Sequence, residues 1–76
     1  MNVSEELDLR GVPCPANAAR AVLQISMMGS GEVLLLFVDQ GEPLENVIRS
    51  LEVAGHSIRK REQEGAFWRV WRSEEH

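Results

Sequence analysis

The run Val33-Leu34-Leu35-Leu36-Phe37-Val38 is the longest uninterrupted apolar stretch in the chain, and turn residues flank it on both sides. Six consecutive apolar residues have the length of a strand, and the lack of alternation is typical of a strand buried on both faces. We therefore predict that residues 33–38 form the central strand of a sheet. The run is far shorter than the roughly 20 residues needed to cross a bilayer, so we expect no membrane span.

Two amphipathic helices are predicted on either side of this strand. Before it, apolar residues recur at helical spacing from Ala16 to Met28, and Gly29-Ser30-Gly31 ends the pattern. After it, Asp39-Gln40-Gly41 turns the chain, Pro43 opens a second helix and Gly55 closes it. The predicted buried faces comprise Ala18, Ala21, Val22, Ile25 and Met28 in the first helix, and Leu44, Val47, Ile48, Leu51 and Ala54 in the second.

Three further segments have strand signals. Leu7-Asp8-Leu9 alternates and is ended by Gly11, His56-Ser57-Ile58 begins a third strand, and Phe67 to Trp71 forms a fourth after a turn at Gln63-Glu64-Gly65. The alternation through residues 59–62 is poor, so it assigns no faces there. The order is βαβαββ, which predicts a two-layer α/β sandwich with a four-stranded mixed sheet and both helices on one face.

The length of 76 residues predicts one domain spanning residues 1–76, with flexible ends at Met1–Glu6 and Ser73–His76. The acidic start lacks the basic and apolar regions of a signal peptide, and a single cysteine cannot form an internal disulfide. We therefore expect a cytoplasmic protein, and we expect a monomer. The net charge of −4 disfavours a nucleic acid partner.

The sequence shows no metal-ligand spacing. Its one cysteine and two distant histidines, His56 and His76, predict neither a metal site nor a cofactor. His56 follows the end of the second predicted helix, where a histidine interacts with the last carbonyl groups. We interpret His56 as structural rather than catalytic.

Cys14 is the candidate functional residue. It stands between Pro13 and Pro15, and proline suits the first position of a helix because its missing N–H costs nothing there. Cys14 would then lie at or next to the N-cap, where free backbone N–H groups stabilise a thiolate. The alternative is a small buried cysteine in the core. The flanking prolines favour a rigid, partly exposed loop.

Asp39 and Arg10 are candidate supporting residues. If the first two strands are parallel, a right-handed crossover places the loops after them at one sheet edge, so Asp39 would neighbour Cys14. Its carboxylate would accept a hydrogen bond from a thiol or persulfide, or it would simply be a turn residue. Arg10 would favour the thiolate or dock a donor by its charge, or it would be an ordinary exposed arginine at a strand end.

A lone exposed thiol has few chemical options. Hydrolysis by a cysteine nucleophile needs a base and an oxyanion site, and a dithiol redox cycle needs a second cysteine. The remaining role is to accept a group and pass it on. Sulfane sulfur carried as a persulfide fits that role, because the acceptor needs only a nucleophilic sulfur and a docking surface.

The chain resembles the TusA-like sulfurtransferase family, also called SirA-like. The resemblance covers nearly the whole chain and rests on Leu7-Asp8-Leu9-Arg10-Gly11, Cys14-Pro15, Gly31-Glu32, Asp39, Gly41-Glu42-Pro43 and Gly55-His56. It implies a single TusA-like domain that carries a persulfide on Cys14. It also implies a sulfur-donor protein of the cysteine desulfurase or rhodanese type and an acceptor protein thiol. Family destinations include tRNA thiolation, sulfur oxidation and other sulfur or selenium routes.

One position departs from the family signature C-P-x-P, because the chain reads Cys14-Pro15-Ala16-Asn17. Asn17 leaves the nucleophile in place, adds local hydrogen-bonding options and removes a rigid proline from the first helical turn. This variant points to a branch that serves a sulfur pathway other than tRNA thiolation.

Two alternatives to a sulfur carrier remain open from the sequence. The first is a non-catalytic interaction or regulatory module that binds its partner through the Trp68/Trp71 hairpin, because tryptophan and arginine are favoured in interfaces. The second is nucleic acid binding by the same hairpin, which has basic neighbours but is disfavoured by the net charge.

Overall fold

The computed structural model describes residues 3–29 and 31–73 and has the predicted order βαβαββ. The elements are β1 (Glu5–Asp8), α1 (Ala16–Ser26), β2 (Val33–Asp39), α2 (Glu42–Val53), β3 (Ser57–Glu64) and β4 (Phe67–Ser73). Of the residues predicted to form flexible ends, Glu5 and Glu6 belong to β1 and Ser73 belongs to β4. The outermost residues, 1–2 and 74–76, lie outside the described residues.

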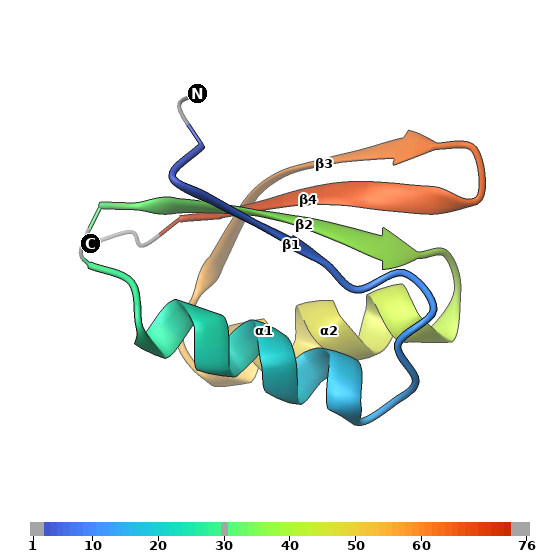
Figure 1. Cartoon of the computed structure of the whole chain (residues 1–76), viewed down its shortest axis with the longest axis horizontal. Coiled ribbons are helices and arrows are strands. Elements are labelled where there is room, and N and C mark those ends of the chain that lie inside the picture. The colour runs from blue at the N-terminus through green and yellow to red at the C-terminus, as the bar shows by residue number, and fades with distance from the viewer. Residues whose placement is uncertain (1–2, 30, 74–76) are drawn as a thin grey trace.

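The four strands form one mixed sheet in the order β1-β2-β4-β3 (Figure 1). β1 pairs with β2 in parallel, whereas β4 pairs antiparallel with both β2 and β3. The predicted central strand is confirmed, since Leu36 on β2 pairs with Leu7 on one side and Val70 on the other. Pairing on both sides and burial explain the continuous apolar run.

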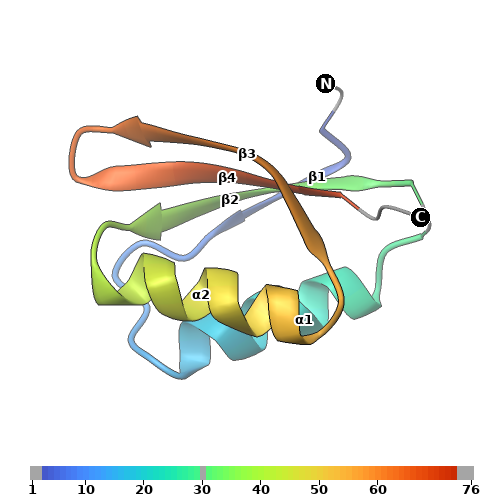
Figure 2. The same ribbon diagram turned by 180° about the vertical axis from the view of Figure 1, so that it is seen from behind.

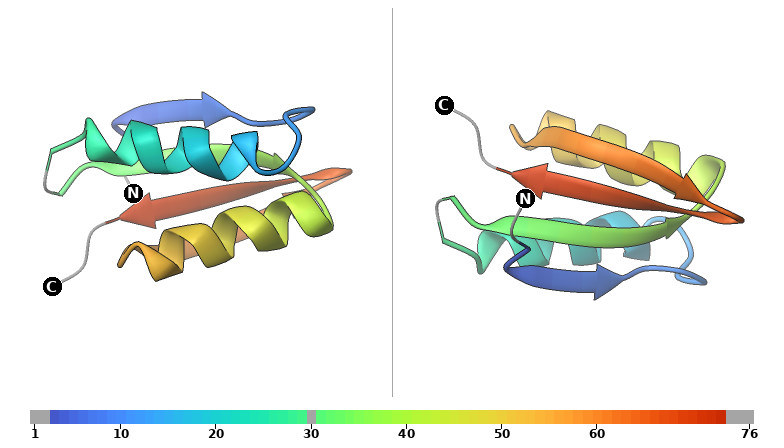
Figure 3. Two further views of the ribbon diagram at one scale, coloured as in Figure 1. Left: turned by 90° about the horizontal axis from the view of Figure 1, so that it is seen from below. Right: turned by 90° about the horizontal axis from the view of Figure 1, so that it is seen from above.

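Both helices cover the same face of the sheet, and no helix or strand among residues 3–29 and 31–73 covers the opposite face (Figure 3). Fully or nearly fully buried apolar side chains fill the space between the layers. They are Leu9, Ala18, Ala21, Ile25, Leu34, Leu36, Val38, Leu44, Val47, Leu51 and Val70. The two-layer α/β sandwich predicted from the sequence is therefore confirmed. Within the described residues, no helix is long and apolar enough to cross a membrane.

Both helices end slightly earlier than predicted. α1 ends at Ser26, and the N–H groups of Met27 and Met28 donate to the carbonyls of Gln24 and Ile25 in shorter three-residue turns. Met28 still packs against the core. In α2, Ala54 is the exposed C-cap residue and does not belong to the buried face.

A β-bulge in β3 explains the poor alternation of residues 59–62. Ile58 pairs with Arg72, but the next paired residue is Lys60, which lies opposite Trp71, so Arg59 is the extra residue of the bulge. An inserted residue shifts all following side chains to the other face of the strand. The strand was therefore predictable from its apolar start and the turn that follows it, whereas its faces were not.

His56 contacts a buried arginine at the far end of the sheet. Its N–H donates to the Leu51 carbonyl at 2.9 Å, as expected for a residue at a helix end. Its Nδ1 lies 2.7 Å from Nη2 of Arg72, whose side chain is buried. Arginine has no acceptor atoms, so Nη2 is the donor and Nδ1 the acceptor. The contacts support the structural interpretation of His56.

We expect His56→Ala to lower the free energy of unfolding by about 1–3 kcal/mol, because the buried guanidinium loses an acceptor. Urea unfolding measures the loss. Arg72→Met removes the donor without leaving a buried charge, so the double variant should lose less than the sum of the two single losses. Additive losses would show that the contact contributes nothing.

Candidate functional site

The loops that carry the candidate residues meet at one end of the molecule, as predicted from the parallel pairing of β1 and β2. Figures 1 and 2 show the β1–α1 loop, the β2–α2 loop and the β3–β4 turn at this shared end. Hydrogen bonds join them: Gly11 N–H donates to the Asp39 carboxylate, and Gln40 N–H donates to the Ala66 carbonyl at 3.1 Å. The site is therefore a junction of three chain segments.

Cys14 lies in an exposed turn directly before α1 and is a free thiol. Pro15 is the N-cap residue and Ala16 begins the helix, one residue later than predicted, so Cys14 lies next to the N-cap. The Cys14–Pro15 peptide bond is cis. The Asn17 N–H closes the turn by donating to the Pro13 carbonyl at 3.0 Å. Cys14 is thus presented to solvent on a turn that its own backbone hydrogen bond holds.

Asp39 holds the loop that leads to Cys14. Its Oδ2 accepts a hydrogen bond from the Gly11 N–H at 2.7 Å, although the two residues are 28 positions apart in the chain. Gly11 has φ of +77°, a left-handed conformation in which glycine avoids the strain of a Cβ atom. Asp39 therefore binds the backbone of the β1–α1 loop at Gly11. The loops after β1 and β2 meet at one sheet edge, as the crossover predicted.

The guanidinium of Arg10 contacts the Asp8 carboxylate and two aromatic rings. Its Nε and Nη2 donate to the two carboxylate oxygens of Asp8 at 2.9 and 2.8 Å. Its guanidinium carbon lies 4.6 Å from the ring centroid of Phe67 and 5.5 Å from that of Phe37. These contacts engage its charge and its planar face on the uncovered side of the sheet.

The ion pair between Asp8 and Arg10 changes the pKa of both side chains. The side-chain hydrogen bond from Arg10, assisted by its backbone N–H, lowers the pKa of Asp8 from 3.8 to about 2. The Asp8 hydrogen bond raises the pKa of Arg10, with a smaller contribution from the charge of Asp39. The folded pKa of Asp8 lies below its unfolded value, so the pair stabilises the fold above pH 3.8 and the contribution disappears as the pH falls through about 2.

We expect the carboxyl carbon of Asp8 to titrate by NMR with a pKa of about 2 in the wild type. In Arg10→Ala the pKa of Asp8 should rise toward its ordinary value of 3.8, because both guanidinium donors are removed while the backbone N–H of residue 10 still donates to the carboxylate. An Asp8 that titrates at 3.8 in the wild type would contradict the assignment.

Asn17 is completely buried, with 0% of its surface exposed. Its Oδ1 accepts from the Ala18 N–H at 2.6 Å, and its Nδ2 lies 3.5 Å from the Pro43 carbonyl oxygen of α2. A second amide from α2, Nδ2 of Asn46, lies 3.4 Å from the same Oδ1. The residue that departs from the family signature thus connects the start of α1 to the start of α2.

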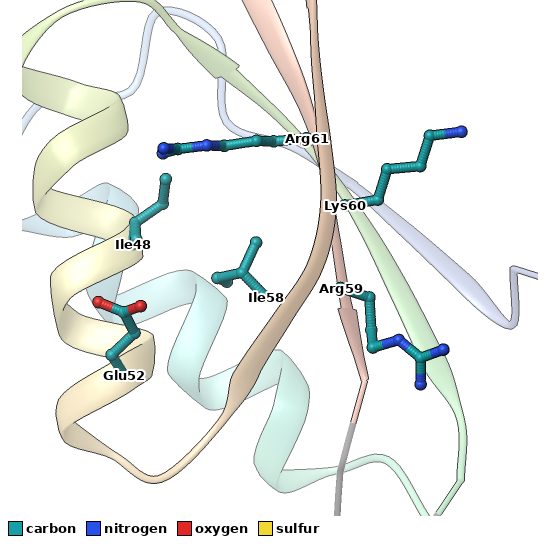
Figure 4. A pocket seen from close by; sticks show the side chains of 6 residues that line it. All are labelled: Ile48, Glu52, Ile58, Arg59, Lys60 and Arg61. Carbon is teal, nitrogen blue, oxygen red and sulfur yellow. The ribbon is translucent and has the colours of Figure 1, made fainter.

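Two hollows lie between α2 and the β3–β4 hairpin. The first has a volume of about 500 Å³, and its lining includes two isoleucines and two charged residues, Ile48, Ile58, Glu52 and Arg61. In Figure 4, Arg59 and Lys60 lie on the other side of β3 from these four side chains. The second, of about 660 Å³, is lined by Gln40, Gly41, Leu44, Glu45, Gln63 and Trp68. Only the second includes residues of the β2–α2 loop, so it lies at the same end as Cys14.

Trp68 and Trp71 do not form one surface. Residues three apart on a strand point to opposite faces, and Trp68 packs against the core between the layers. Trp71 is 9% exposed and lies on the uncovered face, beneath Lys60 and Arg69. The two tryptophans of the hairpin therefore lie on opposite faces of β4, and Trp68 packs against the core.

Some contacts of this site had no signal in the sequence. Asn46 approaches Asn17 only because α1 and α2 pack side by side, and the two residues are 29 positions apart. Phe37 and Phe67 meet Arg10 only because β2 and β4 are paired, and their ring centroids are 6.1 Å apart. A buried amide at position 17 does require partners, so a polar residue on the facing helix was the available clue.

Comparison with known proteins identifies relatives of this chain. A family model described as Sulfurtransferase TusA matches residues 5–72. A protein of Archaeoglobus fulgidus named "Putative sulfur carrier protein" is 34% identical over 65 residues. That match covers 86% of this chain and 74% of the relative. Cys14 and all four supporting residues predicted from the sequence, Arg10, Pro15, Asn17 and Asp39, fall within the range that the family model matches.

Proposed function

The chain belongs to the TusA sulfurtransferase family, and from this premise we propose that it is a sulfur carrier whose persulfide forms on Cys14. Family membership and the name of the relative support a sulfur carrier role. The observation that carries the assignment to this residue is the exposure of the free Cys14 thiol on a turn held from both sides. Asp39 holds the turn through Gly11, and Asn17 closes it.

The proposed transfer is an exchange between sulfur atoms. The Cys14 thiolate attacks the outer sulfur of a persulfide on the donor protein, the donor S–S bond breaks, and the donor cysteine leaves as a thiolate. The proton of the outer sulfur stays with it, so Cys14 becomes a persulfide. An acceptor thiolate then attacks that outer sulfur and releases Cys14 as a thiolate. Neither step needs an external oxidant or reductant.

An exchange of this kind needs the three sulfur atoms nearly in line, which favours an exposed turn over a buried pocket. Cys14 meets that need because the residues on both sides of it, Pro13 and Pro15, are also exposed. The hollow of about 660 Å³ at the same end offers room for side chains of a partner. We propose a cysteine desulfurase or rhodanese-type protein as donor and a protein thiol as acceptor.

The test is the intact mass of the reduced protein after incubation with a cysteine desulfurase and cysteine, or with a rhodanese and thiosulfate. We expect a gain of one sulfur atom that a reductant removes. The single cysteine makes the assignment unambiguous. A sample alkylated beforehand is the control and should gain nothing. If the unblocked protein gains no sulfur from either donor, the proposal is wrong.

A further inference from the structure

The fully buried carboxamide of Asn17 is unusual for its position in the fold. Among the described residues, only Asn17 and Arg72 are polar or charged and buried. An amide that leaves water without hydrogen-bond partners costs free energy, so a buried asparagine requires a defined set of contacts. Asn17 lies three residues after Cys14, in the first turn of α1. Its contacts therefore bear on the turn that carries the thiol.

The contacts of Asn17 form a bridge between two helices. On the α1 side, its N–H binds the Pro13 carbonyl at 3.0 Å, and its Oδ1 accepts from the Ala18 N–H at 2.6 Å. On the α2 side, its Nδ2 faces the Pro43 carbonyl at 3.5 Å, and its Oδ1 faces Nδ2 of Asn46 at 3.4 Å. These four contacts use three atoms of Asn17: the backbone and side-chain nitrogens donate, and the side-chain oxygen accepts twice.

Asn46 and the Ala18 N–H both donate to the Asn17 oxygen and together fix the orientation of that bridge. An amide can rotate by half a turn and exchange its oxygen and nitrogen, but Asn46 presents a donor to one end of the Asn17 carboxamide and Pro43 presents an acceptor to the other. Only one orientation satisfies both. Asn46 itself is partly buried and lies on the first turns of α2, which the core holds through Leu44 and Val47.

We propose that Asn46 is a positioning residue for sulfur transfer at Cys14 and acts through the carboxamide of Asn17. The inference rests on the proposed function, because it concerns the geometry of the same transfer. The Asn46 side chain donates to the Asn17 side chain, and the Asn17 N–H donates to the Pro13 carbonyl. Cys14 lies in the turn between Pro13 and Asn17. The rigid α2 thereby sets the direction from which a partner sulfur reaches the thiol.

The test compares two reactions of the same thiol in Asn46→Ala. Transfer from a cysteine desulfurase with cysteine needs the aligned turn, and a misplacement of about 1 Å can slow such a step by about a hundredfold. We expect the rate of transfer at saturating donor to fall by about tenfold or more. Alkylation by iodoacetamide, a small reagent with no fixed approach, should stay within about twofold, a difference worth less than 0.5 kcal/mol.

Controls separate positioning from a general loss of structure. Arg49→Ala changes an exposed residue one turn further along α2 and should leave both reactions unchanged. Adding Asn46→Ala to Asn17→Ala should slow transfer no further, because both changes break one link. Transfer within about twofold of the wild type in Asn46→Ala, or additive losses in the double variant, would overturn the proposal. If Asn46→Ala does not fold, Asn46→Asp, which keeps the shape and loses the donor, is judged by the same results.

Hydrogen exchange distinguishes failure of this inference from failure of the proposed function. The Asn17 amide hydrogen is bound to the Pro13 carbonyl, so it should exchange faster in Asn46→Ala, while the Leu36 amide in the sheet should not change. If the wild type accepts no sulfur but this exchange is faster, the carrier role is wrong and the link is real. If the exchange is unchanged, Asn46 does not hold the turn and the inference is wrong.

Discussion

Cys14→Ser will gain no sulfur from either donor system under conditions in which the wild type gains one atom. Serine keeps the size and the backbone of the turn, but its hydroxyl is far less nucleophilic than a thiolate toward sulfur. No second cysteine exists to replace the lost nucleophile. Intact-mass spectra of both proteins after equal incubation measure the effect, which should be a complete loss.

The variant should keep its fold, because the Cys14 side chain is exposed and belongs to no core contact. Equal thermal unfolding midpoints would show this. Loss of onward delivery to an acceptor thiol is the second expected consequence. A Cys14→Ser protein that still binds a donor but carries no sulfur separates docking from chemistry. A variant that still gains a reducible sulfur would remove Cys14 from the mechanism.

Leu36→Ala should destabilise the fold by about 2–5 kcal/mol, because it removes a fully buried side chain and leaves a cavity. Leu36 is at the centre of β2, between β1 and β4, and faces the helix layer. A domain of this size has a total stability on the order of 4–11 kcal/mol, so the loss takes a large share of it. Urea unfolding followed by tryptophan fluorescence measures the change.

Leu23→Ala is the matched control, since the same atoms are removed from a side chain that is 60% exposed. We expect it to change the free energy of unfolding by less than about 0.5 kcal/mol. If the two leucine variants lost equal stability, the core between the helices and the sheet would not be where the structure places it. Cys14 reactivity toward iodoacetamide should fall with neither variant while the protein remains folded.

The secondary structure was predictable from local patterns. The apolar run of residues 33–38 gave the buried strand, and helical spacing with glycine and proline signals gave both helices to within about two residues. The position of Cys14 beside a helix start also followed from Pro13 and Pro15 alone. Each of these features depends on residues that are near one another in the chain, so the sequence contains the information directly.

The contacts around the site were decided by packing. The sequence predicted that the loops of Cys14 and Asp39 meet at one edge of the sheet. It could not predict that Asp39 binds the Gly11 N–H. The sequence left two interpretations of Arg10 open, a supporting role at the thiol and an ordinary exposed position. It did not predict the ion pair with Asp8 that the structure shows. It left Asn17 with unspecified hydrogen bonds, and Asn46 is 29 residues away.

The amino-acid sequence by itself therefore determined the order of elements, the buried strand and the exposed nucleophile, because periodicity, proline and glycine act over a few residues. Only the tertiary structure decided which side chains hold the Cys14 turn and which faces Trp68 and Trp71 occupy. Those outcomes depend on strand register, on a bulge at Arg59 and on the contact of α1 with α2. A hydrogen bond needs its atoms about 3 Å apart, and the folded chain alone sets that distance.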